Sequence, residues 1–234
     1  MPAGVESEVV MDILYYLGHG SHHQNRELRY SLRALEKHCK DIDNIWIVGN
    51  KPPFLTGIQY LWVEDSAEWW QNAFNKTMAA INAGISNTFL LMNDDFYMLK
   101  DFYASRYPYY HKGDIMEKAR NKYQEVIVST RRVLEKSGKP YRHYGVHCPM
   151  RINAQKYREL ARFYGDKYAN LPPVSARCLY GNLFCRGKLA ADNKGSTLKN
   201  SVTGCYSSAN WAGNALKELQ ALYPTPSRWE IDDA

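Results

Sequence analysis

The sequence predicts an α/β fold with a mostly parallel sheet, helices on both faces and an elaborated C-terminal part. Between residues 11 and 99, short apolar runs alternate with polar segments in which apolar residues recur at helical spacing. This order is typical of a parallel sheet covered by helices. With 234 residues, the chain is also long enough to bury a large core as one domain.

Four strands and two helices are expected in the first part of the chain. The predicted strands are the apolar runs at 11–18, 44–50, 58–65 and 89–99. After the first run, Leu28, Leu32 and Leu35 recur at helical spacing, and Gly84 is placed to close a second helix as its C-cap. In such sheets ligands bind outside the carboxyl ends of the strands, so we expect a site at that edge.

Beyond residue 100 the periodic signal is weaker. Helical character is seen over 113–138 and 153–168, with a strand-like piece at 140–152 between them. The stretch 190–210 is rich in Ser, Asn, Gly and Lys, which predicts a mobile loop.

The charge distribution, the cysteines and the hydropathy indicate which partners and which cellular setting the protein has. Residues 1–100 carry 8 Lys/Arg and 12 Asp/Glu, and the rest of the chain carries 22 and 12. A basic half indicates either a solvated surface or an anionic partner, and both readings stay open. The five cysteines include no CxxC pair, so we expect a reducing, cytoplasmic setting. No apolar run approaches the roughly 18 residues of a membrane span, and residues 1–10 predict a disordered leader.

Three polar residues, Asn93, Asp94 and Asp95, interrupt the apolar run at 89–99. Burial of an unpaired charge costs several kcal/mol, so these carboxylates need compensation. One explanation is a cap on the following turn. The explanation that we favour is a divalent cation, since Mg²⁺ typically binds one or two carboxylates together with the phosphate oxygens of a substrate. We therefore predict Asp94 and Asp95 as ligands of Mn²⁺ or Mg²⁺.

The stretch after the first strand combines glycines with basic residues. Gly18 and Gly20 would let backbone N–H groups approach a phosphate, and Arg26 or Arg29 could bind it bidentately. The nearby histidines, among them His19, lack a fourth ligand at convincing spacing, which argues against a zinc site.

His147 lies between a Gly-Val pair and Pro149, at a corner between a strand and a loop. A histidine there could act as a general base, as a nucleophile toward phosphorus or as a metal ligand. A hydrogen-bonded core histidine is the alternative.

Several of these stretches resemble the Stealth-type sugar-phosphate transferases. The segments "NRELRYSLRALEKH", "IWIVGNKPPFL" and "FLLMNDDFYM" are similar to that family's second signature region, and "VHCPMRINAQKYREL" with "SARCLYGN" is similar to its third. The first region is only echoed by "YLGHGS", where His19 stands in place of the expected acidic residue.

The resemblance implies a compact nucleotide-sugar fold that is Rossmann-like or GT-A-like. It implies one transferase domain over 11–234, with a donor-binding half at 11–100 and a basic, acceptor-side half at 101–234. From this resemblance we predict Asp95 and His147 as the catalytic residues and Asp94 and Asp95 as the metal ligands. Together with the glycine-containing loop, the predicted donor-binding residues are Gly18, His19, Gly20, Arg26, Arg29, Arg33 and Arg177.

The function predicted is a metal-dependent glycosyltransferase that moves a sugar from a nucleotide-sugar donor to an acceptor hydroxyl. An anionic acceptor fits the basic half, and hydroxymethylated DNA bases, as a phage-like enzyme would modify, are one such acceptor. One alternative is a Stealth-type sugar-1-phosphotransferase acting on a glycan. Another is a nucleic-acid- or sugar-binding module without catalysis.

Overall fold

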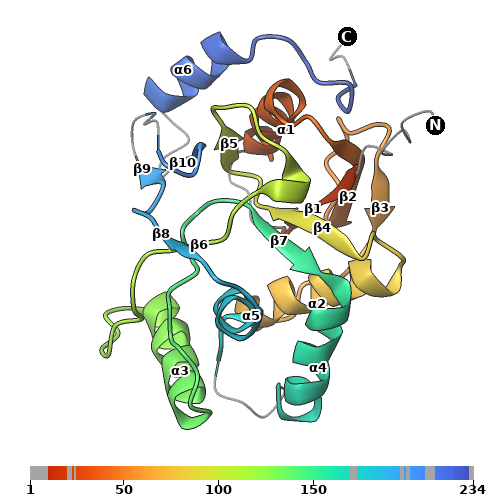
Figure 1. Cartoon of the computed structure of the whole chain (residues 1–234). Coiled ribbons are helices and arrows are strands. Elements are labelled where there is room, and N and C mark those ends of the chain that lie inside the picture. The colour runs from red at the N-terminus through yellow and green to blue at the C-terminus, as the bar shows by residue number, and fades with distance from the viewer. Residues whose placement is uncertain are drawn as a thin grey trace, which may run out of the picture.

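A five-stranded sheet forms the centre of the protein, in a computed structural model that describes residues 10–19, 23, 25–168, 173–195, 198, 201–208 and 214–231. The strand order is β3-β2-β1-β4-β7 (Figure 1). The parallel strands are β1 (Met11–Leu17), β2 (Ile42–Gly49), β3 (Gln59–Leu61) and β4 (Thr88–Met92), and β7 (Met150–Asn153) runs antiparallel to β4. The mostly parallel sheet predicted from the alternating pattern is therefore confirmed. The predicted leader, apart from Val10, lies outside the described residues.

Helices cover both faces of this sheet, as predicted (Figure 1). On one side lies α1 (Arg26–His38), and on the other lie α2 (Trp69–Asn82), α3 (Lys122–Lys136), α4 (Ala154–Tyr168) and α5 (Ala176–Phe184). Alternate residues of β1 supply the two cores: Ile13 packs in the cluster of α1, whereas Leu14 packs in the cluster of α2 and α4. This alternation follows from the two-residue period of a strand.

The C-terminal part adds two small sheets beside the main one. In the first, β5 (Phe96–Met98) pairs antiparallel with β10 (Cys205–Ser208), which pairs parallel with β9 (Lys194–Gly195). The second consists of β6 (Tyr110–His111) and β8 (Lys188–Leu189). A short 3₁₀ helix (Ala104–Arg106) and α6 (Asn214–Leu222) complete the described elements.

The helix predicted over 113–138 begins only at Lys122, and the strand predicted at 140–152 is limited to β7. Two other expectations for secondary structure were wrong. The run 89–99 is not one strand, because it divides at Asn93–Asp95 into β4 of the main sheet and β5 of the small one. The stretch 190–210 is not simply a loop, since it contains β9 and β10. Both errors have one cause: β10 lies far along the chain from its partner β5, and such short, long-range pairing leaves no local periodic signal.

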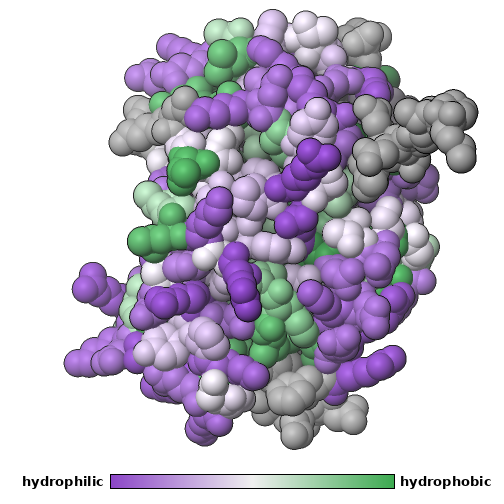
Figure 2. Space-filling model, in the orientation of Figure 1, coloured by the Kyte–Doolittle hydropathy of each residue, from purple (hydrophilic) through white to green (hydrophobic). Residues whose placement is uncertain are grey.

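The described helices include none that is long and apolar enough to cross a membrane. Polar side chains cover most of the face seen in Figure 2, and apolar residues gather over α5, between α3 and α4.

Candidate active site

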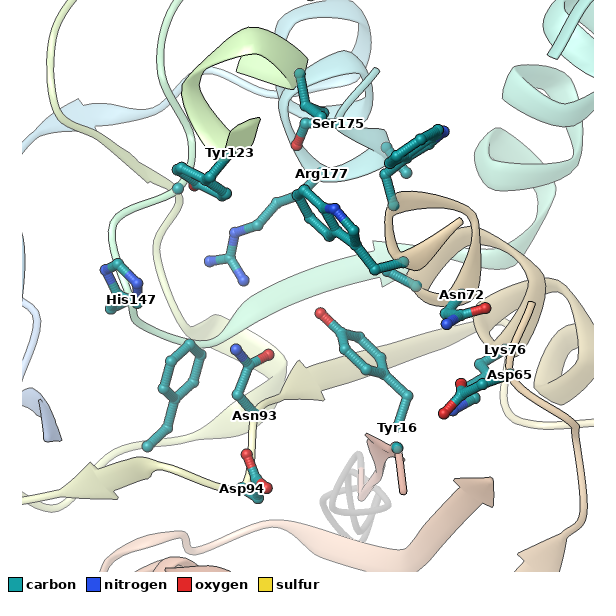
Figure 3. A pocket seen from close by; sticks show the side chains of 18 of the residues that line it. Tyr16, Asp65, Asn72, Lys76, Asn93, Asp94, Tyr123, His147, Ser175 and Arg177 are labelled. Carbon is teal, nitrogen blue, oxygen red and sulfur yellow. The ribbon is translucent and has the colours of Figure 1, made fainter. Parts of the chain in front are cut away.

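A cavity of about 630 Å³ opens at the carboxyl ends of β1 and β4. Its walls come from the ends of β1 and β4, the loop after β3, the starts of α1, α3 and α5, the first two turns of α2, the start of β5 and the loop before β7 (Figure 3). The residues that line it include Tyr16, Gly18, His19, Asp65, Trp69, Lys76, Asn93, Asp94, Tyr123, Gly145, His147, Ser175 and Arg177. The sheet edge predicted to bind a ligand is thus the edge that carries a cavity.

Asp94 is the acidic centre of this cavity. Burial, followed by the charges of Asp95 and Glu27, raises the pKa of Asp94 to about 7. Next to it, the Oδ1 atom of Asn93 is buried and has no hydrogen-bond partner among the described residues. A carboxylate that is costly to ionise and an unsatisfied amide oxygen at one strand end fit a bound cation.

The oxygen donors suit Mg²⁺ or Mn²⁺, which prefer carboxylate and carbonyl ligands. Among the described residues, however, no group of three His, Cys, Asp or Glu side chains is arranged to hold a metal ion. A cation here would therefore need ligand or water oxygens to complete its coordination, as is usual for Mg²⁺ bound with a substrate phosphate.

Asp95 faces away from this centre and is not among the residues lining the cavity. Its Oδ2 atom accepts a hydrogen bond of 2.7 Å from Oγ of Ser207 in β10 and lies 3.8 Å from Nζ of Lys194 in β9. Asp94 and Asp95 both lie in the turn between β4 and β5, and this turn separates the two carboxylates. Asp95 therefore connects the turn after β4 of the main sheet to β9 and β10 of the small sheet, and Asp94 lines the cavity.

His147 lines the cavity in a backbone conformation with φ of 26°. Its Nδ1 atom lies 2.6 Å from Oδ1 of Asp192, and Nζ of Lys112 lies 2.5 Å from Oδ2 of the same carboxylate. Burial raises the pKa of Asp192, but the hydrogen bonds from His147 and Lys112 outweigh burial and hold it below its usual value. The histidine is therefore held by an ionised partner rather than buried as part of an apolar core.

Arg177 brings positive charge to the opposite wall, near the N-terminus of α5 (Figure 3). Its guanidinium donates from Nε to the carbonyl oxygen of Tyr144 at 2.9 Å and from Nη2 to that of Cys148. Ser175 is the N-cap, and its Oγ accepts from the backbone N–H of Cys178. A guanidinium beside a helix N-terminus is a suitable environment for an anion.

Sequence reasoning missed several residues of the cavity. Lys76 is buried, and its Nζ donates to the carbonyl oxygen of Leu17 and to Oδ1 of Asp65, both at 2.5 Å. Oδ2 of Asp65 accepts from the backbone N–H of His19 at 3.3 Å, so this pair fixes the end of β1. The acidic end of the third predicted strand was the available signal for Asp65, whereas Lys76 carried none because it lies within a helical pattern.

Aromatic side chains form much of the remaining wall. The rings of Trp69 and Tyr123 stack with centroids 6.0 Å apart, and the two residues are 47% and 44% exposed. Exposed aromatic faces of this kind are suited to a base or a sugar ring.

Three of the predicted donor-binding residues, all of them arginines, do not line the cavity. Arg29 and Arg33 both bind Glu230, whose side chain is fully buried, so their charge is already compensated at the C-terminal segment. Arg26 is exposed and does not line the cavity. Gly20 lies outside the described residues. Gly18, His19 and Arg177 do line it.

Comparisons with known proteins bear on the fold. No protein-family model matches the chain, so the resemblance to Stealth-type transferases gains no support there. No curated protein matches the sequence. Among solved structures, the chain is similar to the galactosyltransferase LgtC, crystallised with donor and acceptor sugar analogues, with a TM-score of 0.50 and 12% sequence identity. The alignment covers 93% of this chain and 98% of the LgtC chain. At this identity the likeness establishes the fold alone, and the protein has a GT-A-like α/β fold.

Proposed function

We propose that the protein is a metal-dependent glycosyltransferase that moves a sugar from a nucleotide-sugar donor to an acceptor hydroxyl. The observation that carries this proposal is the partly buried carboxyl of Asp94, whose pKa is raised to about 7, just after β4 and in the same cavity as Arg177 and the N-terminus of α5. A diphosphate has enough negative charge to be held from both walls, by a cation on one side and a guanidinium on the other. The GT-A-like fold shared with a galactosyltransferase supports the same reading.

The donor would be held by residues of both walls. Asp94 and Asn93 would hold Mn²⁺ or Mg²⁺, which when bound stabilises the charge that develops on the leaving diphosphate. Arg177 and the first N–H groups of α5 would bind phosphate oxygens. The exposed rings of Trp69 and Tyr123 would pack against the base or the sugar.

The acceptor would meet His147. In a direct displacement, the acceptor hydroxyl loses its proton to the imidazole as its oxygen forms a bond to the anomeric carbon. The bond from that carbon to the diphosphate oxygen breaks at the same time, and the nucleoside diphosphate leaves with the electron pair. We prefer His147 to Asp95 as the base, because His147 lines the cavity and Asp95 does not.

A sugar-1-phosphotransferase would use the same groups but direct the acceptor at phosphorus, and the sequence resemblance to Stealth-type enzymes is what favours it. The mass of the product distinguishes the two reactions, because only phosphotransfer retains one phosphate on the acceptor.

Net positive charge after residue 100 supports an anionic acceptor, for which transfer should weaken as salt rises. Neither the cavity nor the comparisons favour DNA over other anionic acceptors.

Ligand-dependent stability provides the first test. We expect one UDP- or GDP-sugar to raise the melting temperature, and Mn²⁺ or Mg²⁺ to enlarge the shift, since a ligand at 100 times its Kd adds about 2.7 kcal/mol of stability. Asp94→Asn should remove the part of the shift that depends on metal. Asp101→Asn is the matched control, because Asp101 is an exposed carboxylate that pairs with His38 and Lys40 outside the cavity. If no nucleotide sugar stabilises the wild-type protein with either metal, the proposed function is wrong.

A further inference from the structure

We propose that Asp192 is a positioning residue, which holds the imidazole of His147 with Nε2 presented to the cavity, and that Lys112 holds Asp192 in turn. This inference rests on the proposed function for its purpose, although the arrangement itself can be tested without it. Asp192 lies in the segment before β9 that the sequence pattern indicated as part of a mobile loop.

The backbone of His147 is held first. A residue other than glycine with φ of 26° is strained, at a cost on the order of 1–3 kcal/mol, and persists where its surroundings fix it. The buried side chain of Asn193 supplies that restraint, because its Nδ2 donates to the carbonyl oxygens of Val146 at 3.1 Å and of His147 at 3.3 Å. Asn193, the residue next to Asp192, thus fixes the backbone at His147 through these two hydrogen bonds.

The ring of His147 is held by Asp192 itself. An ionised carboxylate only accepts hydrogen bonds, so the 2.6 Å contact with Oδ1 requires a proton on Nδ1 of His147. In the neutral imidazole this leaves the lone pair on Nε2, the form that a general base needs. Within the described part of the chain, Nε2 has no hydrogen-bond partner, and the residue lines the cavity.

Lys112 keeps Asp192 in place. Its Nζ lies 2.5 Å from Oδ2, so each oxygen of the carboxylate has its own partner and rotation of the group would break one of them. The low pKa of Asp192 agrees with a carboxylate that stays ionised beside two cationic or hydrogen-bonding groups.

The same short segment also reaches the turn after β4. Lys194 lies 3.8 Å from Oδ2 of Asp95, and the backbone N–H of Ser207 donates to the carbonyl oxygen of Asn193 at 3.2 Å. Ser207 also donates to Asp95 through Oγ. Residues 192–194 therefore connect the corner of His147 to the turn that carries Asp94, which fixes these two parts of the cavity relative to each other.

The arrangement is tested by the tautomer of His147. In ¹⁵N NMR spectra of the imidazole, recorded where it is neutral, the wild-type ring should carry its proton on Nδ1. Asp192→Asn should shift the population toward the Nε2–H form, because the charged acceptor is lost. Asp114→Asn is the matched control, since that exposed carboxylate pairs with Arg142 at 2.5 Å and does not line the cavity. An Nε2–H tautomer in the wild-type protein would overturn the proposal.

Kinetics test the consequence for transfer. We expect Asp192→Asn to lower kcat by about 10–100-fold with little change in the KM for the donor, because partners that orient a working imidazole have effects of this size. Lys112→Met should act in the same direction more weakly. An unchanged kcat, or an equal loss in Asp114→Asn, would overturn the positioning role. If no donor supports transfer at all, the proposed function fails, and the tautomer alone decides whether Asp192 positions His147.

Discussion

Asparagine in place of Asp94 is expected to slow transfer severely and, at the same time, to stabilise the metal-free protein above neutral pH. In the folded protein the pKa of this carboxyl rises from 3.8 to about 7, chiefly through burial. The folded state then holds a proton that the unfolded chain has released, so stability falls as pH rises from about 4 to about 7. Each unit of pKa corresponds to about 1.4 kcal/mol, which makes the full cost above pH 7 on the order of a few kcal/mol. A neutral amide of the same shape does not bear this cost.

Urea unfolding in the presence of a chelator measures the gain in stability. The variant should exceed the wild-type protein at pH 8, and the difference should shrink at pH 5, where the wild-type carboxyl is largely protonated. Transfer in saturating Mn²⁺ should fall on the order of 10³-fold, since a metal at a developing charge supplies several kcal/mol.

Asp101→Asn serves as the control here too. Hydrogen bonds from His38 and Lys40 lower the pKa of Asp101, so its loss should give no gain at pH 8. Two results would contradict the assignment of Asp94: a variant no more stable than the wild-type protein at pH 8, or one that keeps its transfer activity.

The turn after β4 shows which part of the site the sequence contains. Three polar residues at the end of an apolar run located the acidic centre, because a buried strand seldom ends in carboxylates without a reason. The sequence did not show that Asp94 lines the cavity while Asp95 binds Ser207. Asp95 turns to Ser207, 112 positions away, and that contact depends on β10, which is only four residues long. No local pattern predicts such pairing.

The residues that hold His147 were also not predictable from the sequence. The residue type and corner position of His147 allowed a catalytic role, and the family resemblance favoured it. Asp192, Asn193 and Lys112, which hold the histidine, come from segments with no recognisable pattern. The sequence thus predicted the α/β fold and several residues that face the cavity, whereas the residues that support them emerge only from the tertiary structure.

Arg29 and Arg33 were assigned to the donor through the resemblance to Stealth-type enzymes, and Arg29 also through its place near Gly18 and Gly20. The sequence does not distinguish a guanidinium that binds phosphate from one that binds a carboxylate, because the two have the same chemistry. In the folded chain their partner is Glu230, which accepts from Nη1 of Arg29 at 3.0 Å and from Nε and Nη2 of Arg33, both at 2.8 Å. It also accepts from the backbone N–H and the hydroxyl of Ser227. The cluster joins α1 to the last described segment of the chain.

Glu230→Gln is therefore expected to destabilise the protein by about 3–5 kcal/mol, because removal of one partner leaves two guanidiniums in a largely buried place without a counter-charge. Their side chains are only 15% and 12% exposed, and that of Glu230 is fully buried. The hydrogen bonds of Arg33 and Ser227 outweigh burial and lower the pKa of Glu230. Its contribution is thus present above its ordinary pKa of 4.5 and is lost as pH falls through the lower, folded value. Urea unfolding at pH 7 measures the loss.

Glu36→Gln is the matched control for this cluster. Glu36 lies on the same helix as the two arginines. Its carboxylate forms an ion pair of 3.7 Å with Arg228, whose side chain is 60% exposed, and accepts from the backbone N–H of the same residue at 3.2 and 3.3 Å, an acceptor role that a glutamine oxygen keeps. Such a pair contributes about 0–1 kcal/mol, so the midpoint should hardly move. A loss in Glu230→Gln no larger than in Glu36→Gln would contradict the structural role. If Arg29 and Arg33 bound the donor instead, the glutamine variant would free them and tighten donor binding, whereas a structural cluster predicts lower stability with donor affinity unchanged.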